Sequence, residues 1–250
     1  MTARIPEAWK GQRVVESFDV DKEGRLRPHV MFSWLLNAAW GHTRETAWSF
    51  EAVSARQLMW VLNKLQVRIM RLPRWGEHIT IESWGKRIER FYALRDFVIS
   101  SSAGERLAAA TTAWMILDAR SYRPQKLDDM KAGFPWHPDR SAVETTLKKV
   151  GELARGEARA RFRVSYSDID VNRHAAATTY LQWMLDSFSF EKLTGNELAS
   201  AEMSFLSEAT LGDEVSVAVE SVAQTDLCAI RREPDQQELC RAVLAWTTAK

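Results

Sequence analysis

The apolar and polar positions in the first half of the chain predict one long helix among several strands. From Pro28 to His42, apolar residues recur at helical spacing, and proline is favoured in the first turn of a helix. Residues 56–70 alternate with a period of two, which is typical of a strand with one covered face. Further strands are expected at residues 13–20, 79–83, 91–100 and 106–117.

The second half repeats this order of elements. A strand is expected at residues 158–164 and a helix at residues 177–188. Four more strands are expected at residues 201–206, 214–222, 227–232 and 239–246. Trp75-Gly76-Glu77 in one half and Leu211-Gly212-Asp213 in the other are similar turns that precede equivalent strands. An internal duplication explains this pattern, and each copy is expected to be an α+β layer in which a sheet covers one helix.

The segment between the two copies breaks the rhythm. It holds Pro124, Pro135 and Pro138 and shows no strand alternation. We expect an N-terminal domain at residues 1–122, an interdomain connection at 123–155 with a short helix near 141–150, and a C-terminal domain at 156–250.

Composition narrows the functional classes. Hydrophobic residues make up 46% and charged residues 27% of the chain, which predicts a soluble globular protein with a sizeable core. A net charge of +1 argues against a protein built around nucleic acid. The 11 tryptophans are scattered without interleaved Lys or Arg clusters, so we expect them in the core or lining a pocket.

The sequence also bears on location and cofactors. The N-terminus shows no apolar segment of a signal peptide, and no run approaches the roughly 20 apolar residues of a membrane span. We therefore expect a cytoplasmic protein without membrane insertion. Cys228 and Cys240 are too few for a disulfide framework and lack metal-ligand spacing, which fits a reducing compartment.

The candidate chemistry lies in Asp170-Val171-Asn172-Arg173-His174, just before the second helix. If this segment is extended, Asp170, Asn172 and His174 share one side. They would meet a helix start, which supplies unpaired N–H groups and the positive end of a dipole. The alternative is a plain turn whose Asp and Asn cap the helix.

These residues resemble a motif of the acyl-acyl carrier protein (acyl-ACP) thioesterase family, bacterial type. The family's Asp-x-Asn-x-His motif appears as Asp170, Asn172 and His174, and its later glutamate as Glu208, 34 residues beyond His174. Leu72-Pro73-Arg74-Trp75-Gly76-Glu77 is similar to the turn in its first half. The resemblance implies two tandem hotdog domains, each an antiparallel sheet wrapped around a long central helix.

Two departures from the family pattern affect the chemistry. Members often continue the motif as His-Val-Asn-Asn, whereas here His174 is followed by three alanines. Many plant members carry a cysteine directly after the glutamate, whereas here the residue is Ala209. A cysteine nucleophile at that position is therefore excluded.

The resemblance implies hydrolysis of a fatty acyl-ACP thioester to free fatty acid during fatty acid biosynthesis, with no metal and no other cofactor. His174 is expected to accept a proton from water, since an unperturbed histidine titrates near pH 6.5. Glu208 would orient the imidazole or hold the water, and Asn172 would bind the carbonyl or position the water. Backbone N–H groups where a helix starts at Ala175 would form an oxyanion site. Asp170 stays open as orienter, base or nucleophile.

The first copy is expected to serve binding instead. Arg27-Pro28-His29-Val30 precedes its helix without an Asp-x-Asn, so one active site per chain is predicted. The resemblance implies that this copy lines the acyl tunnel, and the pattern offers Met31, Trp34, Leu35, Ala38, Met59 and Trp60 as lining or as ordinary core. The partner implied is an acidic acyl carrier protein, for which Arg159, Arg161, Arg163, Lys148 and Lys149 are docking candidates.

Other readings stay open from sequence alone. An acyl-CoA thioesterase of the same fold is the nearest alternative, followed by a hotdog hydratase or dehydratase, although the His-Phe-Pro-Gly motif of one such group is missing. A non-enzymatic acyl-binding module is the third. Single hotdog domains usually pair, so the two copies either pair within one chain or the chain forms a homodimer.

Overall fold

The computed structural model describes residues 6–144, 146–153 and 156–249. The chain divides into two compact units, Met1–Leu147 and Lys148–Lys250. No helix in the described ranges is both long enough and apolar enough to cross a membrane.

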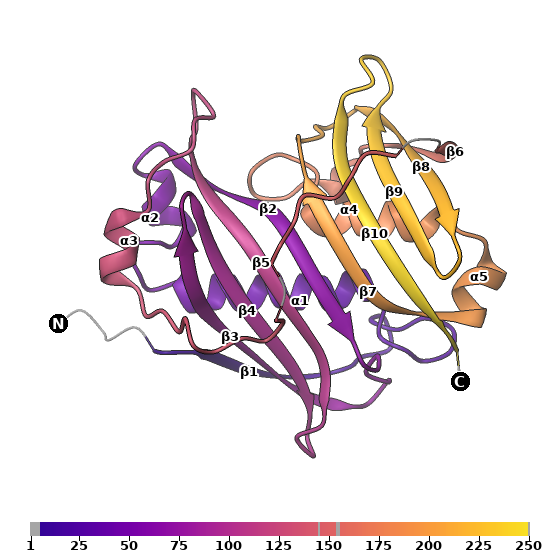
Figure 1. The fold of residues 1–250 in the computed structure, drawn as a ribbon, viewed down its shortest axis with the longest axis horizontal. Coiled ribbons are helices and arrows are strands. Elements are labelled where there is room, and N and C mark those ends of the chain that lie inside the picture. The colour runs from indigo at the N-terminus through magenta and orange to yellow at the C-terminus, as the bar shows by residue number, and fades with distance from the viewer. Residues whose placement is uncertain (1–5, 145, 154–155, 250) are drawn as a thin grey trace. The chain divides into compact units, whose positions relative to one another are not determined.

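The first unit is a five-stranded antiparallel sheet around one long helix. Its strands lie in the order β1-β3-β4-β5-β2, and α1 crosses behind them in Figure 1. The elements are β1 (Trp9–Val14), α1 (Pro28–Thr43), α2 (Phe50–Ser54), β2 (Leu58–Ile69), β3 (His78–Glu89), β4 (Tyr92–Ser101), β5 (Arg106–Asp118) and α3 (Asp128–Gly133).

Helix α1 is the centre of the first core. Pro28 occupies its first turn, where a missing N–H has no cost, and Met31, Leu35 and Ala38 are buried on one face. The helix contacts β1 and β3. Burying a side chain such as Leu35 contributes about 1.5–3 kcal/mol, so this stripe holds the helix against the sheet.

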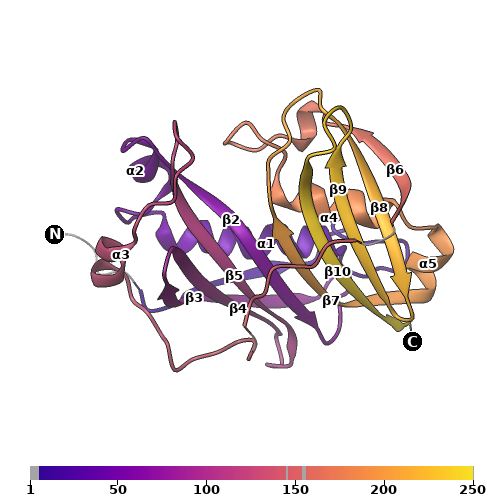
Figure 2. The ribbon, with the colours of Figure 1, turned by 45° about the horizontal axis from the view of Figure 1, so that its top comes forward.

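The second unit repeats the arrangement. Its strands lie in the order β7-β10-β9-β8-β6, all antiparallel, and Figure 2 shows α4 behind β9 and β10. The elements are β6 (Glu157–Arg163), a 3₁₀ turn (Tyr166–Asp168), α4 (Ala177–Asp186), α5 (Phe190–Gly195), β7 (Asn196–Phe205), β8 (Glu214–Val222), β9 (Thr225–Arg232) and β10 (Glu238–Thr248). Leu181 and Met184 of α4 are fully buried, and Trp183 stacks on Phe162 with ring centroids 5.9 Å apart.

Equivalent turns confirm that the two units share one backbone design. Gly76 has a φ of 78° and donates its N–H to the Val15 carbonyl at 2.9 Å. Gly212 has a φ of 92° and donates in the same way to Val164, also at 2.9 Å. Glycine suits both positions because a positive φ carries little steric cost without a Cβ.

Every predicted strand is present, but β7 begins five residues earlier and β3 ends six residues later than expected, and the first strand is displaced. The first strand is Trp9–Val14, so the prediction of residues 13–20 was wrong. Residues 16–19 form a turn instead, in which the Asp19 carboxylate accepts the Glu16 N–H at 2.9 Å. Local hydrogen bonding by a short acidic side chain outcompeted the strand pattern here.

The segment after β5 also differs from expectation. Its short helix is α3, at Asp128–Gly133, and not near residues 141–150. Met130 and Phe134 join the apolar core of the first unit. Farther on, the Ala142 N–H donates to Asp96 Oδ2 at 2.6 Å, so the compact unit continues to Leu147, beyond the expected boundary at residue 122.

Candidate active site

The motif that carries the candidate chemistry forms a tight turn. Ile169 and Ala175 make an isolated bridge across it, and the Asp170 N–H donates to the His174 carbonyl at 2.9 Å. Arg173 adopts a φ of 66°, which a non-glycine residue rarely does. The expectation of an extended segment with alternate side chains on one side was therefore wrong, because a turn stabilised by local hydrogen bonds replaces it.

Asp170 holds this turn together. Its Oδ1 accepts the backbone N–H of Asn172 at 2.8 Å, and its Oδ2 lies 3.4 Å from the Asn172 side-chain Nδ2. Aspartate favours such turns because its short side chain can accept from the backbone two residues on. It does not cap the following helix, whose N-cap residue is Ala176, without a side-chain hydrogen bond.

His174 and Glu208 meet across the site. His174 Nδ1 lies 3.1 Å from Glu208 Oε2, and the two side chains are 21% and 36% exposed. An ionised carboxylate can only accept, so the neutral imidazole carries its proton on Nδ1. Its Nε2 lone pair is then available as a base, and the partly open site admits water.

Glu208 is held in place by its neighbours along the chain. It follows the end of β7, where the N–H groups of Leu206 and Ser207 both donate to the Leu239 carbonyl, at 2.8 and 3.2 Å. The next residue, Ala209, is fully buried and donates its N–H to the Tyr180 hydroxyl at 2.9 Å. The backbone is therefore anchored on both sides of Glu208.

Tyr180 is the residue that sequence reasoning missed as part of the site. It lies on α4, is 3% exposed, and fixes the strand end that carries Glu208. Burial raises its pKa well above the usual range, and the negative charges of Glu208 and Asp170 add to that shift. A tyrosine within the buried stripe of a helix is a usable signal, since a buried hydroxyl needs a partner.

The helix starts at Ala177, as its periodicity predicted, and not at Ala175, where the oxyanion site was expected. Ala175 donates its N–H to the Ala209 carbonyl and Ala176 donates to the Asp168 carbonyl, both at 2.8 Å. Helix α4 begins at Ala177. The N–H groups of Ala175 and Ala176 are therefore occupied, whereas those of Ala177 and Thr178, in the first turn of the helix, have no intrahelical acceptor.

The first unit contains a turn with the same backbone hydrogen bonds. The Asp21 N–H donates to the Arg25 carbonyl at 2.8 Å, as Asp170 does to His174. The Glu23 N–H donates to Asp21 Oδ1 at 2.9 Å, as Asn172 does to Asp170.

This match assigns the counterparts of the site. Leu26 donates to the Pro73 carbonyl at 2.8 Å, just as Ala175 donates to Ala209. Asp21, Glu23 and Arg25 therefore stand where Asp170, Asn172 and His174 stand, and Leu72 stands where Glu208 does. The counterpart of the motif is residues 21–25, and not Arg27-Pro28-His29-Val30, which begins α1.

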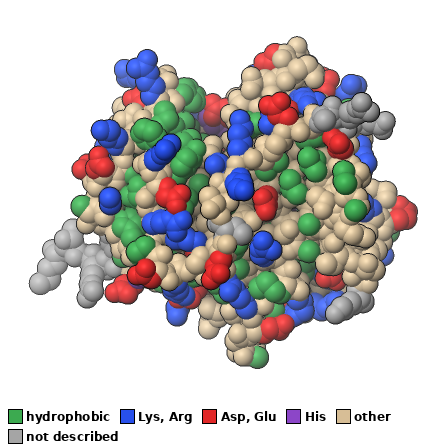
Figure 3. All heavy atoms as spheres, in the orientation of Figure 1, with side chains coloured by type: hydrophobic (Ala, Val, Ile, Leu, Met, Phe, Trp, Pro, Cys, Tyr) green, Lys and Arg blue, Asp and Glu red, His purple; other side chains and the backbone are tan. Residues whose placement is uncertain are grey.

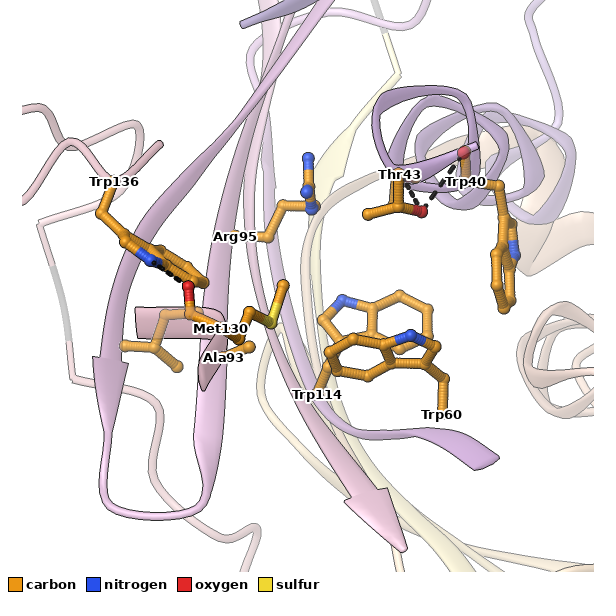
Figure 4. Close-up of a pocket in the computed structure, with 10 residues that line it drawn as sticks. Trp40, Thr43, Trp60, Ala93, Arg95, Trp114, Met130 and Trp136 are labelled. Carbon is orange, nitrogen blue, oxygen red and sulfur yellow. Dashed lines mark hydrogen bonds between the residues drawn. The ribbon is translucent and has the colours of Figure 1, made fainter. Parts of the chain in front are cut away.

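The first unit also contains a pocket. Its walls come from α1, β2, β4, β5 and the α3 region, and Figure 4 shows the indoles of Trp60 and Trp114 side by side within it. The lining residues are Ala39, Trp40, Thr43, Trp60, Ala93, Leu94, Arg95, Trp114, Met130 and Trp136. Four tryptophans line this pocket as expected, whereas Trp75 is 65% exposed and departs from the expectation.

Most of the residues that the sequence pattern suggested as tunnel lining do not line this pocket. Of that set only Trp60 lines this pocket. Met31, Trp34, Leu35 and Ala38 are buried core residues of α1, and Met59 is half-buried on β2. Helical spacing identified the buried face of α1 but could not say which part of that face meets a cavity.

Neither cysteine nor a metal cluster adds to the site. Cys228 and Cys240 are free, fully buried thiols, and burial raises the pKa of Cys228 to about 12. A thiol with a raised pKa is a poor nucleophile. In the part of the chain that the structure describes, no group of three His, Cys, Asp or Glu residues could hold a metal ion.

Known proteins match the chain on both units. The N-terminal domain of acyl-ACP thioesterases matches residues 7–133, and their C-terminal domain matches residues 151–248. A palmitoyl-acyl carrier protein thioesterase of Cuphea hookeriana is 28% identical over 187 residues, covering 72% of this chain and 43% of the relative. Oleoyl-acyl carrier protein thioesterase 1 of Arabidopsis thaliana is 23% identical over 225 residues, covering 83% and 62%. The chain thus spans less than two thirds of the length of these relatives.

Solved structures confirm the fold. An acyl-ACP thioesterase from Bacteroides thetaiotaomicron superposes with a TM-score of 0.85 at 22% identity, covering 96% of this chain and 98% of that one. The 12:0-ACP thioesterase of Umbellularia californica also gives 0.85, at 18% identity, covering 98% of each chain. The architecture is two tandem hotdog domains. Since the family's two domains match 7–133 and 151–248, the chain belongs to the acyl-ACP thioesterase family.

Proposed function

We propose that the chain is an acyl-ACP thioesterase, which hydrolyses fatty acyl-acyl carrier protein to free fatty acid and carrier protein in fatty acid biosynthesis. The observation that carries this proposal is the 3.1 Å contact between His174 Nδ1 and Glu208 Oε2. A carboxylate that fixes the imidazole tautomer leaves the other nitrogen free to activate water. Family membership supplies the substrate class.

In the proposed reaction, water attacks the thioester carbonyl carbon. His174 Nε2 takes one proton from the water as the C–O bond forms, and the Glu208 carboxylate stabilises the imidazolium. The N–H groups of Ala177 and Thr178, with the Asn172 side chain, bind the oxygen that becomes negative. Loss of one such donor typically costs about 3–4 kcal/mol in the transition state.

The tetrahedral intermediate then collapses. The C–S bond breaks, and His174 returns its proton to the leaving thiolate of the carrier, which regenerates the neutral imidazole. Asp170 is proposed to position the turn, because Asn172 donates to both of its carboxylate oxygens. We propose one active site per chain, since Arg25 and Leu72 replace the histidine and the glutamate in the first unit.

A docking surface for the acidic carrier is proposed on β6. This strand lies at the edge of its sheet, and Arg159, Arg161 and Arg163 are exposed along it, with exposed Lys148 and Lys149 in the same unit. Figure 3 shows Lys and Arg side chains interspersed with acidic ones on the face in view, so a local stripe and not a broad basic face would make the contact. Rim charges mainly change the association rate and its dependence on salt.

The cytoplasm is the proposed location. Cys228 and Cys240 are both free thiols, as expected in a reducing compartment.

The test is product analysis with a ladder of acyl chains on carrier protein and on CoA. We expect free fatty acid from the wild type, loss of product in His174→Ala, and wild-type turnover in His78→Ala, a matched control at an exposed histidine of β3. Equal or better turnover of the CoA series would replace the carrier protein by CoA as the substrate. An Arg161→Glu, Arg163→Glu double variant should raise KM for the carrier series while leaving the CoA series unchanged.

A further inference from the structure

The pocket of the first unit contains a buried positive charge. Arg95 lies on β4, lines the pocket and is 6% exposed. Figure 4 shows it reaching from β4 toward the end of α1 that carries Thr43. A buried charge is costly unless another charge or a full set of hydrogen bonds compensates for it, so the groups around this guanidinium decide its role.

Among the described residues, the partners of Arg95 are neutral: two hydrogen-bonding side chains and the Phe134 ring, whose centroid lies 5.6 Å from the guanidinium carbon. Nη1 lies 3.0 Å from both His42 Nδ1 and Ser83 Oγ. His42 Nε2 lies 2.7 Å from the Pro6 carbonyl, which requires a proton on Nε2 and leaves Nδ1 as an acceptor. Burial lowers the pKa of His42 to about 4, so this ring is neutral near pH 7.

No carboxylate balances the charge. In the described ranges, Arg95 takes part in no ion pair, and no acceptor is found for its Nε or Nη2. The adjacent Asp96 is engaged elsewhere, with Lys86 Nζ at 3.2 Å, Thr111 Oγ1 at 2.6 Å and the Ala142 N–H at 2.6 Å. Burial lowers the pKa of Arg95 to about 9, which still leaves it protonated near neutral pH.

The walls around the guanidinium are aromatic and held rigidly. Trp60 Nε1 donates to the Trp48 carbonyl at 3.0 Å, Trp114 Nε1 to Thr112 Oγ1 at 2.8 Å, and Trp136 Nε1 to the Met130 carbonyl at 3.2 Å. The N–H groups of these three indoles are occupied, so the three rings present mainly apolar surface to the pocket. The pocket therefore combines an apolar wall with one unbalanced cation.

The geometry points to a carboxylate on an apolar chain as the ligand of this pocket, with Arg95 binding the carboxylate and the indoles packing on the chain. A carboxylate suits the remaining edge of the guanidinium, formed by Nε and Nη2, since this edge donates in a planar fork that matches the two carboxylate oxygens. The carboxylate has two sources: a free fatty acid, or the distal end of a dicarboxylic acyl group on the substrate. Binding is independent of the proposed thioesterase activity, whereas use of a dicarboxylic substrate rests on it.

Octanoate is the ligand to use, with octanol as its uncharged match, in binding titrations followed by tryptophan fluorescence and by calorimetry. We expect wild-type protein to bind octanoate at least tenfold more tightly than octanol. Arg95→Met should abolish that preference while still binding octanol, and Arg95→Lys should retain part of it. Thermal unfolding of each variant shows whether it has folded.

Two kinetic arms identify the source of the carboxylate. Faster turnover of an acyl-ACP with a distal carboxylate than of its methyl-ended match, lost in Arg95→Met, assigns the substrate. Inhibition of the wild type by octanoate but not by octanol assigns the free acid. Equal binding of octanoate and octanol by wild type, or an unchanged preference in folded Arg95→Met, would overturn the inference. A protein that binds octanoate but hydrolyses nothing would refute only the proposed function.

Discussion

Two turns of the same backbone design stand at equivalent places in the two units. In residues 170–174 the histidine side chain leaves its turn and meets Glu208 at 3.1 Å. In residues 21–25 the equivalent Arg25 turns back onto its own turn, with Nε 2.9 Å from Asp21 and Nη2 3.4 Å from Glu23. The first arrangement can take and return a proton, whereas the second is a closed ion cluster.

The difference shows that backbone geometry alone does not make this site. Arginine stays protonated at any physiological pH and cannot act as a base. Leu72, which replaces Glu208, is buried and apolar, so it could not stabilise a cation in that place. The same turn serves stability in one unit and is proposed to serve chemistry in the other.

The largest expected loss of activity comes from substitution of His174 or Glu208. His174→Ala and Glu208→Ala should each lower kcat/KM on acyl-ACP by about 10²–10⁴-fold, because general base catalysis contributes that much. Both side chains are partly exposed, so the unfolding midpoint should move little. Steady-state kinetics and thermal unfolding of the same preparations measure both. A variant that keeps more than a tenth of wild-type activity would contradict the assignment of its residue.

The reverse outcome is expected in the first unit. Arg25→Ala should reduce the free energy of unfolding by about 1–2 kcal/mol, since the guanidinium is buried while its partners Asp21 and Glu23 are about one-third exposed and partly solvated. Turnover should stay near the wild-type value. Denaturant unfolding and kinetics test this, with exposed Arg90→Ala as the control for a surface arginine of the same unit. Loss of activity without loss of stability would show that this turn has a catalytic role.

Acid should weaken the first unit through two buried histidines, His42 and His29. The pKa of His42 is lowered to about 4 by burial and by the charge of Arg95, and that of His29 to about 4 by burial and Arg27. Each pKa is below its unfolded value near 6.5, so the unfolded state binds more protons between these values. Their contribution to stability is complete above pH 6.5 and falls as the pH drops toward 4. His42→Gln should reduce the slope of the unfolding free energy against pH between about pH 4 and 6.5. An unchanged slope would show that His42 does not cause the loss of stability in acid.

Asp170→Asn separates an orienting carboxylate from a nucleophile. In the wild type, Asp170 Oδ1 accepts the Asn172 N–H at 2.8 Å. The side-chain oxygen of an asparagine can accept the same hydrogen bond, so the turn should persist. We expect kcat to fall by about tenfold or less, since one hydrogen bond within the turn weakens by about 1 kcal/mol. Single-turnover kinetics measure this. A variant as inactive as His174→Ala would favour direct participation of the carboxylate in the reaction.

The smallest effect is expected for the cysteines. Cys228→Ser and Cys240→Ser should leave kcat/KM within about twofold of wild type. Both thiols are fully buried, and burial raises the pKa of each well above its usual value, so neither is a ready nucleophile. Stability should fall slightly as a hydroxyl enters an apolar site. Alkylation under native conditions provides the control: wild-type activity should resist it. A thiol-dependent loss of activity would overturn water activation by His174.

The periodic pattern of apolar residues predicted most of the fold. Strands such as β2 and β8 lay where alternation predicted them, because one face of each carries apolar residues at every second position, as Leu65, Val67 and Ile69 do on β2 and Val215, Val217 and Val219 do on β8. The prediction of the first strand was wrong for a local reason. The Asp19 carboxylate accepts the Glu16 N–H and turns the chain where the apolar pattern continued. The short helix in the connection was misplaced because six residues, Asp128–Gly133, are too few for a periodic signal.

By itself, the sequence determined the duplication, the order of the strands and long helices and the set of candidate catalytic side chains, since these follow from local patterns and from a motif. Only the tertiary structure decided which side chains meet. Glu208 reaches His174 because β7 ends beside the turn and Tyr180 anchors the next residue, Ala209, by a contact 29 positions apart in the chain. The counterpart turn at residues 21–25 was likewise hidden, because Asp21 and Arg25 match their equivalents in backbone hydrogen bonds and not in side-chain chemistry.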